Sequence, residues 1–155
     1  MNTLNSHKTF LLNSAQWERL ELFLTCEPGW DGGDAKGAPE AKTVAEALQV
    51  LEFLRTNGIK CPCLFMGSSA EIEIAHISKN RQTYLNIECM GEGQFMIGWF
   101  DDEHETAFFV HSMTELPEPF IQAMRKLEEE EYGPTDEIGN WSNRSANPEG
   151  RAAGY

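Results

Sequence analysis

The sequence has no long apolar run and few basic residues. Nothing in its 155 residues approaches the roughly 20 consecutive apolar residues that a membrane-spanning helix needs. The segment from Met1 to Lys8 also lacks the basic region and apolar core of a secretory signal, so we expect a cytoplasmic protein. Lys and Arg number 12 against 25 Asp and Glu. Because nucleic acids and anionic membranes are held by cations, this balance argues against direct binding to either.

Cysteine is scarce, and its spacing matches no redox or zinc motif. The chain has four cysteines: Cys26, Cys61, Cys63 and Cys89. Cys61 and Cys63 are too close for an easy mutual disulfide, and a zinc site would need Cys26 or a distant His to join them. We therefore expect reduced, half-buried thiols, with no metal and no cofactor.

The acidic residues are unevenly distributed along the chain. Residues 1–100 carry twelve acids and eight bases, whereas residues 101–137 carry twelve acids against only Arg125 and Lys126. The excess negative charge therefore lies in one predicted hairpin and the helix that follows it. Such a field attracts basic protein surfaces.

Residues 70–111 are typical of an antiparallel β-meander. Apolar and polar residues alternate in four segments, 70–77, 82–90, 94–100 and 105–111, and polar turns of three or four residues separate them. Connections this short join antiparallel neighbours, because a parallel crossover needs a dozen residues or more. In the first segment, the alternation puts Ile72 and Ile74 on a buried face and Glu71 and Glu73 on a wet one.

Three helices are predicted around this meander. The first is capped at Asn13 or Ser14 and ends near Glu27–Gly29, the second runs from Pro39 to an Asn57–Gly58 cap, and the third spans 120–131. Two edge strands are predicted at 9–12 and 59–66. The predicted fold is therefore α+β, with a four- to five-stranded antiparallel meander covered by about three helices. It forms a single domain over residues 1–132, followed by a low-complexity tail at 133–155.

The glycine-rich segment Gly29–Asp34 is predicted to be a structural loop. It lacks the preceding strand and the Lys, Ser or Thr of a phosphate-binding loop. We expect Asp31 to form an Asx turn and Trp30 to pack under the sheet. If the indole is buried there, Trp30→Ala should cost about 3–5 kcal/mol.

The order of these features resembles a family of small uncharacterised bacterial, phage and mobile-element proteins that share a GWDG-type loop. The resemblance rests on Gly29-Trp30-Asp31-Gly32, the helix that follows and the strands up to Phe100, although Gly33-Asp34-Ala35 replaces the family's Tyr-Gly-Ala-like triplet. It implies a compact α+β protein and no established catalytic residues. In its acidity the chain also resembles small phage anti-defence inhibitors of the anti-CRISPR kind.

Two alternatives to a binding module remain open from the sequence. One is a small enzyme with a carboxylate site near Asp31, Glu71 and Glu73. The other is a structural subunit of a larger assembly, whose tail threads into a partner. For the enzyme, no nucleophile, His pair or metal loop with suitable spacing accompanies the three carboxylates.

The favoured hypothesis is a non-catalytic, acidic protein-binding module that docks on a basic surface of a partner. An inhibitor or nucleic-acid mimic acting on a nucleic-acid-binding complex is the most specific form of this hypothesis. The oligomeric state stays open. The residues predicted to contact the partner are Asp101, Asp102, Glu103, Glu105, Glu128, Glu129, Glu130, Glu131 and Trp141.

Overall fold

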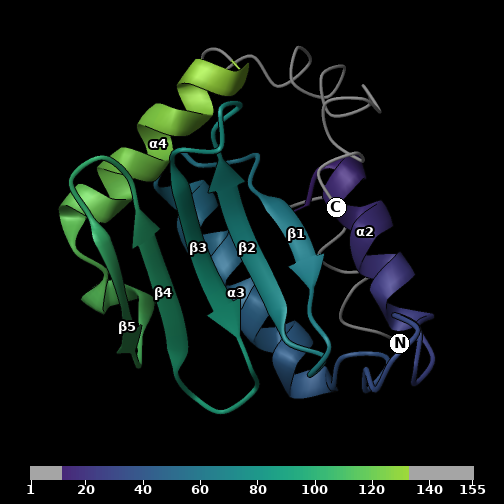
Figure 1. The fold of residues 1–155 in the computed structure, drawn as a ribbon. Helices are drawn as coiled ribbons and strands as arrows, with labels where there is room; N and C mark the ends of the chain where they lie inside the picture. The colour runs from purple at the N-terminus through teal and green to yellow at the C-terminus, as the bar shows by residue number, and fades with distance from the viewer. Residues whose placement is uncertain (1–11, 133–155) are drawn as a thin grey trace.

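The computed structural model describes residues 12–132, which form one antiparallel sheet and three α-helices (Figure 1). The strands are β1 (Cys63–Met66), β2 (Ile72–Ile77), β3 (Tyr84–Cys89), β4 (Phe95–Phe100) and β5 (Glu105–Val110), and the helices are α2 (Ser14–Leu24), α3 (Ala41–Thr56) and α4 (Glu118–Tyr132), with a short 3-10 turn η1 (Met113–Glu115). The strands pair in chain order, so the α+β meander predicted from the sequence is confirmed. Residues 9–11 of a predicted edge strand and the predicted tail lie outside the described residues.

Helix α2 begins with the predicted capping box. The Asn13 side chain accepts a hydrogen bond from the Gln16 amide at 2.8 Å, and the Gln16 side chain accepts one from the Asn13 amide at 3.2 Å. The Gln16 amide group also donates to the Pro62 carbonyl at 2.8 Å. The cap therefore fixes the start of α2 and ties the helix to the segment before β1.

Helix α3 ends as predicted but begins later. Asn57 is the C-cap, Gly58 has φ +83°, and the amide of Ile59 returns to the Leu54 carbonyl at 2.8 Å. Glu40 is the N-cap, so Pro39 lies outside the helix rather than in its first turn. One face of α3 is apolar and buried along its whole length: Val44, Ala47, Leu48, Leu51 and Leu54.

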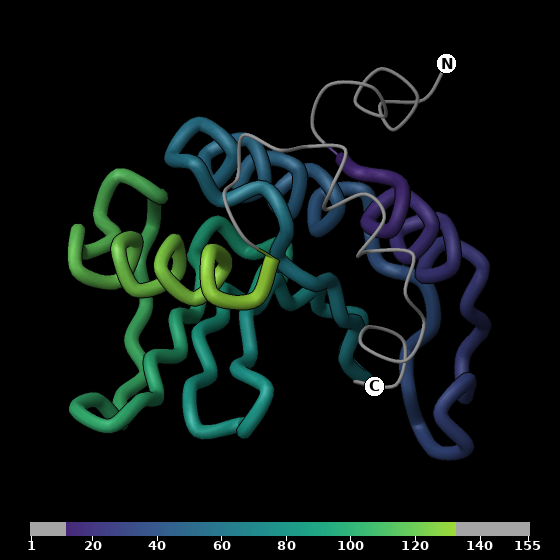
Figure 2. Tube along the Cα trace, turned by 90° about the horizontal axis from the view of Figure 1, so that it is seen from above, coloured from purple at the N-terminus to yellow at the C-terminus, as the bar shows by residue number. Residues whose placement is uncertain are grey.

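The helices lie on one side of the sheet. In Figure 1, α3 and α4 run behind the strands, and the view from above in Figure 2 shows them on the same side of the sheet. Helix α2 contacts the edge strand β1. On the covered side, the strands contribute alternate residues to the core: Leu64, Ile72, Ile74, Leu85, Ile87, Cys89, Phe95, Ile97, Trp99 and Val110. Within residues 12–132, every helix is too short or too polar to cross a bilayer.

The Gly29–Asp34 loop forms the predicted Asx turn but does not bury Trp30. The Asp31 carboxylate accepts hydrogen bonds from the amides of Gly33 at 2.9 Å and Ala35 at 3.3 Å. Trp30 is 43% exposed, so the prediction that it packs under the sheet is wrong. The reason is that α3 and α4 already fill that space, and two successive turns hold the loop outside it. The predicted cost of Trp30→Ala falls accordingly.

The structure also corrects the prediction for Glu128. We expected this residue on a solvated acidic face, but its side chain is completely buried. Its carboxylate accepts hydrogen bonds from the amides of Lys60 and Cys61, both at 2.7 Å, and lies 2.8 Å from Nε2 of His76. Glu128 therefore joins α4 to β2 and to the segment before β1, and it cannot contact a partner.

Removing the Glu128 carboxylate should strongly destabilise the fold. Glu128→Ala leaves two buried amides and His76 without an acceptor, so we expect a loss of about 3–5 kcal/mol in the free energy of unfolding. Urea denaturation measures the loss. The matched control is Glu130→Ala, which removes an exposed carboxylate from the same helix and should change stability by no more than about 0.5 kcal/mol. Equal losses for the two variants would contradict this role.

Candidate functional site

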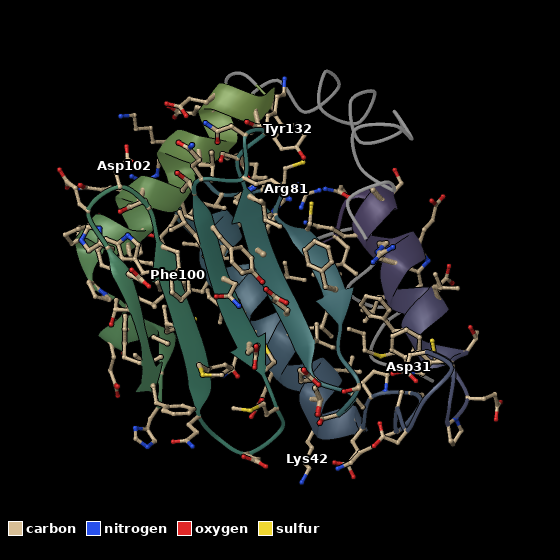
Figure 3. All side chains as sticks on the ribbon, viewed as in Figure 1. Asp31, Lys42, Arg81, Phe100, Asp102 and Tyr132 are labelled. Atoms are coloured by element: carbon tan, nitrogen blue, oxygen red, sulfur yellow. The ribbon has the colours of Figure 1, made fainter. Side chains whose placement is uncertain are left out.

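One face of the sheet points away from α3 and α4, and we call it the open face (Figures 1 and 2). Among the described residues, no helix covers it. Figure 3 looks directly onto it. The strand register assigns to this face Cys63, Phe65, Glu73, Ala75, Ile77, Tyr84, Asn86, Glu88, Met96, Gly98, Phe100, Glu105, Ala107 and Phe109.

At the centre of the open face, two side chains of β3 hold the carboxylate of Glu73. The Tyr84 hydroxyl donates a hydrogen bond to Oε2 of Glu73, and Nδ2 of Asn86 donates to the same oxygen at 2.9 Å. In the register, Glu73 lies directly opposite Glu88, while Asn86 and Tyr84 are the next residues along this face. The Glu73 side chain therefore leans along the sheet towards its two donors.

Small neighbours let Asn86 lie flat on the sheet. Asn86 is only 8% exposed and lies between Ala75 on β2 and Gly98 on β4. A Cβ atom at Gly98 would lie 2.0 Å from Oδ1 of Asn86, which leaves room only for glycine. That Oδ1 atom is buried, with no hydrogen-bond partner in the described part of the chain. In this orientation the Nδ2 group of Asn86 donates to Glu73, while its Oδ1 atom is left without a hydrogen bond among the described residues, which is unfavourable for a buried acceptor.

The open face concentrates negative charge. Burial raises the pKa of Glu73, a hydrogen bond from Asn86 partly offsets this, and the nearby charges of Glu88 and Glu71 raise it further. The pKa of Glu88 is raised by burial and by Glu71. Like charges placed opposite each other destabilise a sheet. The ion pairs within residues 12–132 are Lys42–Glu40, His76–Glu128 and His104–Asp101, so none of them neutralises Glu73 or Glu88.

Two hollows give access to these carboxylates. Glu73 lines a hollow of about 380 Å³ together with Phe65, Ile77, Arg81 and Tyr84. Glu88 and Glu71 line another of about 650 Å³, whose other walls include Lys36 and Lys42. In the part of the chain that the structure describes, no group of three or more His, Cys, Asp or Glu side chains is arranged to hold a metal ion. Both hollows are open to solvent, so an incoming side chain can reach either carboxylate.

The residues of the alternative enzyme site differ in their contacts. Glu71 and Glu73 lie close enough for their charges to interact, as the sequence hypothesis required. Asp31, by contrast, makes its hydrogen bonds inside its own loop. The sequence missed Tyr84, Asn86 and Glu88 as partners of Glu73. Their alternation within the third strand is the signal that places them on the same face.

Comparison with protein families, curated proteins and solved structures finds no match to this chain. The resemblance to proteins with a GWDG-type loop and the likeness to anti-defence inhibitors therefore stay predictions. The functional argument depends on the geometry of the surface alone.

The acidic β4–β5 turn adjoins the open face. Asp101 organises this turn, because its carboxylate accepts from the amides of Glu103 at 2.9 Å and His104 at 2.8 Å, and from the Trp99 indole at 3.1 Å. Burial opposes the ionisation of Asp101, but hydrogen bonds, that from the His104 side chain foremost, lower its pKa. Asp102 and Glu103 are exposed at the tip, and Glu105 lies on the open face itself.

The acids at the end of α4 share one end of the sheet with this turn. Figure 3 shows Asp102 and Tyr132, the last residue of α4, at the same end, where the β2–β3 turn with Arg81 also lies. Glu129 and Glu130 are exposed there, and Glu131 is half-buried. Trp141, the remaining predicted contact, lies outside the described residues.

We predict that a side chain at Gly98 displaces Asn86. Gly98→Ala puts a methyl group in the space of Oδ1, so we expect a loss of about 1–3 kcal/mol in the free energy of unfolding. Combining it with Asn86→Ala removes the clash. The double variant should then lose less stability than the sum of the two single variants, as measured in a double-mutant cycle. Simple additivity would show that the two residues are not in contact.

We also predict a pH-dependent gain in stability for Glu73→Gln. Because the folded state raises the pKa of Glu73 above its usual 4.5, it binds more protons than the unfolded chain between these two pKa values, and stability falls as the pH rises through that window. Glutamine carries no charge, so the variant should melt at a higher temperature than the wild type at pH 7. This difference should shrink as the pH falls towards 4.5.

The control for this experiment is Glu18→Gln on the exposed side of α2. Its melting temperature should equal that of the wild type at both pH values. A Glu73→Gln variant that is less stable than the wild type at pH 7 would show that its carboxylate stabilises the sheet instead.

Proposed function

We propose that this protein is a non-catalytic, acidic module that acts in the cytoplasm by binding a partner protein through its open face. The observation that carries this proposal is a half-buried carboxylate cluster on a sheet face that the helices leave uncovered, in which Glu73 and Glu88 form no ion pair with any described residue. Phe109 supports it too, because 53% of its side chain is exposed on the same face. Apolar side chains beside carboxylates that form no ion pair are complementary to a protein surface that carries basic and apolar side chains.

The charge of the surface supports a protein partner over the other classes. Glu73, Glu88 and Glu105 on the open face would repel phosphates of nucleic acids and of anionic lipids. A surface that holds carboxylates where a partner expects phosphates is also what a nucleic-acid mimic needs. An inhibitor that occupies a basic, nucleic-acid-binding surface is therefore the specific form that we propose.

The first experiment asks whether the open face binds the partner. The protein is immobilised on a resin and incubated with an extract of its native host. The proteins that the resin retains are then identified by mass spectrometry. A variant with Met96→Ser and Phe109→Ser should lose the retained partner. The control Leu22→Ser changes an equally exposed apolar residue of α2, away from the sheet, and should keep it.

Salt and the β4–β5 turn provide the second experiment. Because charge steers the association, we expect the association rate constant to fall steeply as ionic strength rises towards 0.15 M, where screening acts over about 8 Å. A triple variant should slow association: Asp102→Asn, Glu103→Gln and Glu105→Gln. It keeps Asp101, whose hydrogen bonds hold the β4–β5 turn in shape. Retention that is unchanged in the Met96/Phe109 variant and independent of salt would contradict the proposed function.

A further inference from the structure

We infer that Glu73 and Glu88 together receive one lysine or arginine side chain from a peptide segment of the partner, whose flanking apolar side chains lie on Met96, Phe100 and Phe109. This inference rests on the proposed function, and it adds the chemistry of the bound segment. Three features of the open face support it: its charge, its row of small residues and its size.

The charges at the centre of the face require a cation. Glu73 and Glu88 are directly opposite each other on neighbouring strands, and each is partly shielded from water, which raises the pKa of both. Glu73 is faced by Tyr84, Asn86 and, at the rim of its hollow, Arg81. The hollow of Glu88 is lined by further charged residues: Lys36, Glu40, Lys42, Glu71 and Glu92. Within residues 12–132, Arg81 and the two lysines make no ion pair with Glu73 or Glu88. One cation between the two carboxylates would relieve their mutual repulsion.

The rows of side chains across the sheet fit a cation with apolar neighbours. A row of small residues, Ala75, Asn86, Gly98 and Ala107, crosses β2 to β5. Tyr84 and Phe100 stand on one side of it, with their rings stacked at 6.3 Å between centroids. Glu73, Glu88, Met96 and Phe109 stand on the other. Glu73 and Glu88 are thus at the β2–β3 end of their row and Met96 and Phe109 at its β4–β5 end, while Glu105 of β5 lies opposite Phe100 on the other side of the small residues.

The size of the face favours a segment over a whole domain. Five strands about 4.8 Å apart, four of them six residues long and β1 four residues long, give a flat outline of at most about 19 Å by 20 Å, or about 400 Å². This is about half of the 800 Å² that each partner contributes to a standard protein interface. A peptide or a protruding loop of the partner can fill it.

A second copy of the chain is a poor occupant on grounds of charge. In a two-fold symmetric pair the same patch faces itself, so Glu73 and Glu88 would meet either the same acids or the apolar side chains Met96 and Phe109 of the other copy, and in neither case a cation of this row. Like charges in such positions cost several kcal/mol. A partner segment with one cation between apolar residues has the opposite charge at the centre and matching apolar contacts at the sides.

A displayed peptide library tests this inference on the full-length protein. Random twelve-residue peptides are selected on the wild type, and the dissociation constants of the enriched peptides are measured by fluorescence anisotropy. We expect the enriched peptides to share one Lys or Arg flanked by apolar residues. Glu73→Gln should weaken their binding about tenfold or more, and so should replacing the peptide's cation with norleucine. The Glu18→Gln control should bind them as the wild type does.

Several outcomes would overturn the inference. Enriched peptides without a cation, or equal affinity for Glu73→Gln and the wild type, would show that the carboxylates are not the receptor. Tighter peptide binding by a variant with Arg144→Gln and Arg151→Gln would assign the face to the chain's own C-terminal segment. If Glu73→Gln keeps the partner from the host extract while the Met96/Phe109 variant loses it, the proposed function stands and this inference fails. Glu73→Gln is expected to be more stable than the wild type, so unfolding does not confuse the result.

Discussion

Helices cover only one face of the five-stranded sheet, and this one-sided cover sets the character of every strand. Residues that point towards α3 and α4 are mainly apolar, with His76 as a buried polar exception, while their immediate neighbours in the chain lie on the opposite face. Glu128 secures the arrangement from α4, because its buried carboxylate holds the amides of Lys60 and Cys61 and the ring nitrogen of His76. The helices pack against one face of the sheet and form the core with it. The residues of the open face are not needed for this packing, so they can be polar or charged.

The charged residues of the open face lower the stability of the fold. A sheet face exposed to water could carry neutral polar residues, yet this one places Glu73 opposite Glu88 and buries both in part. Asn86 donates to Glu73 but leaves its own Oδ1 without a hydrogen bond among the described residues, and any side chain at position 98 in place of Gly98 would collide with Asn86. Arrangements that oppose stability in this way are typical of functional sites. The same reasoning links the stability of this sheet to the binding that we propose for it.

The sequence predicted the features that depend on local patterns. Alternation located four strands to within two residues, and cap residues located the start of α2 and the end of α3. The end of α2 was predicted near Glu27–Gly29, but the helix ends earlier, at Leu24, with Thr25 as its C-cap. Local patterns failed where distant contacts decide. The Glu128–Glu131 run looked like one solvated group, but Glu128 alone turns inward to meet amides more than sixty residues away. Trp30 looked like a core residue because of its type, but α3 and α4 already filled the core.

The candidate site shows the same division. The pattern put Glu73 on a wet face and left it as an ordinary surface residue. Only the register between β2 and β3 brings Tyr84, Asn86 and Glu88 to it, and register is a property of the paired strands rather than of either sequence segment.

The pKa of Glu73 in the free, full-length protein tests the central claim most directly. Side-chain carboxyl carbons can be followed by carbon NMR through a pH titration, with Glu73→Gln used to assign the signal. If Glu73 lies partly buried without a neutralising cation, it should titrate clearly above 4.5, its value in an unperturbed chain. A midpoint at or below that value would show that hydrogen bonds or a cation of this same chain already stabilise the Glu73 carboxylate, and would contradict the claim that it needs a cation from a partner.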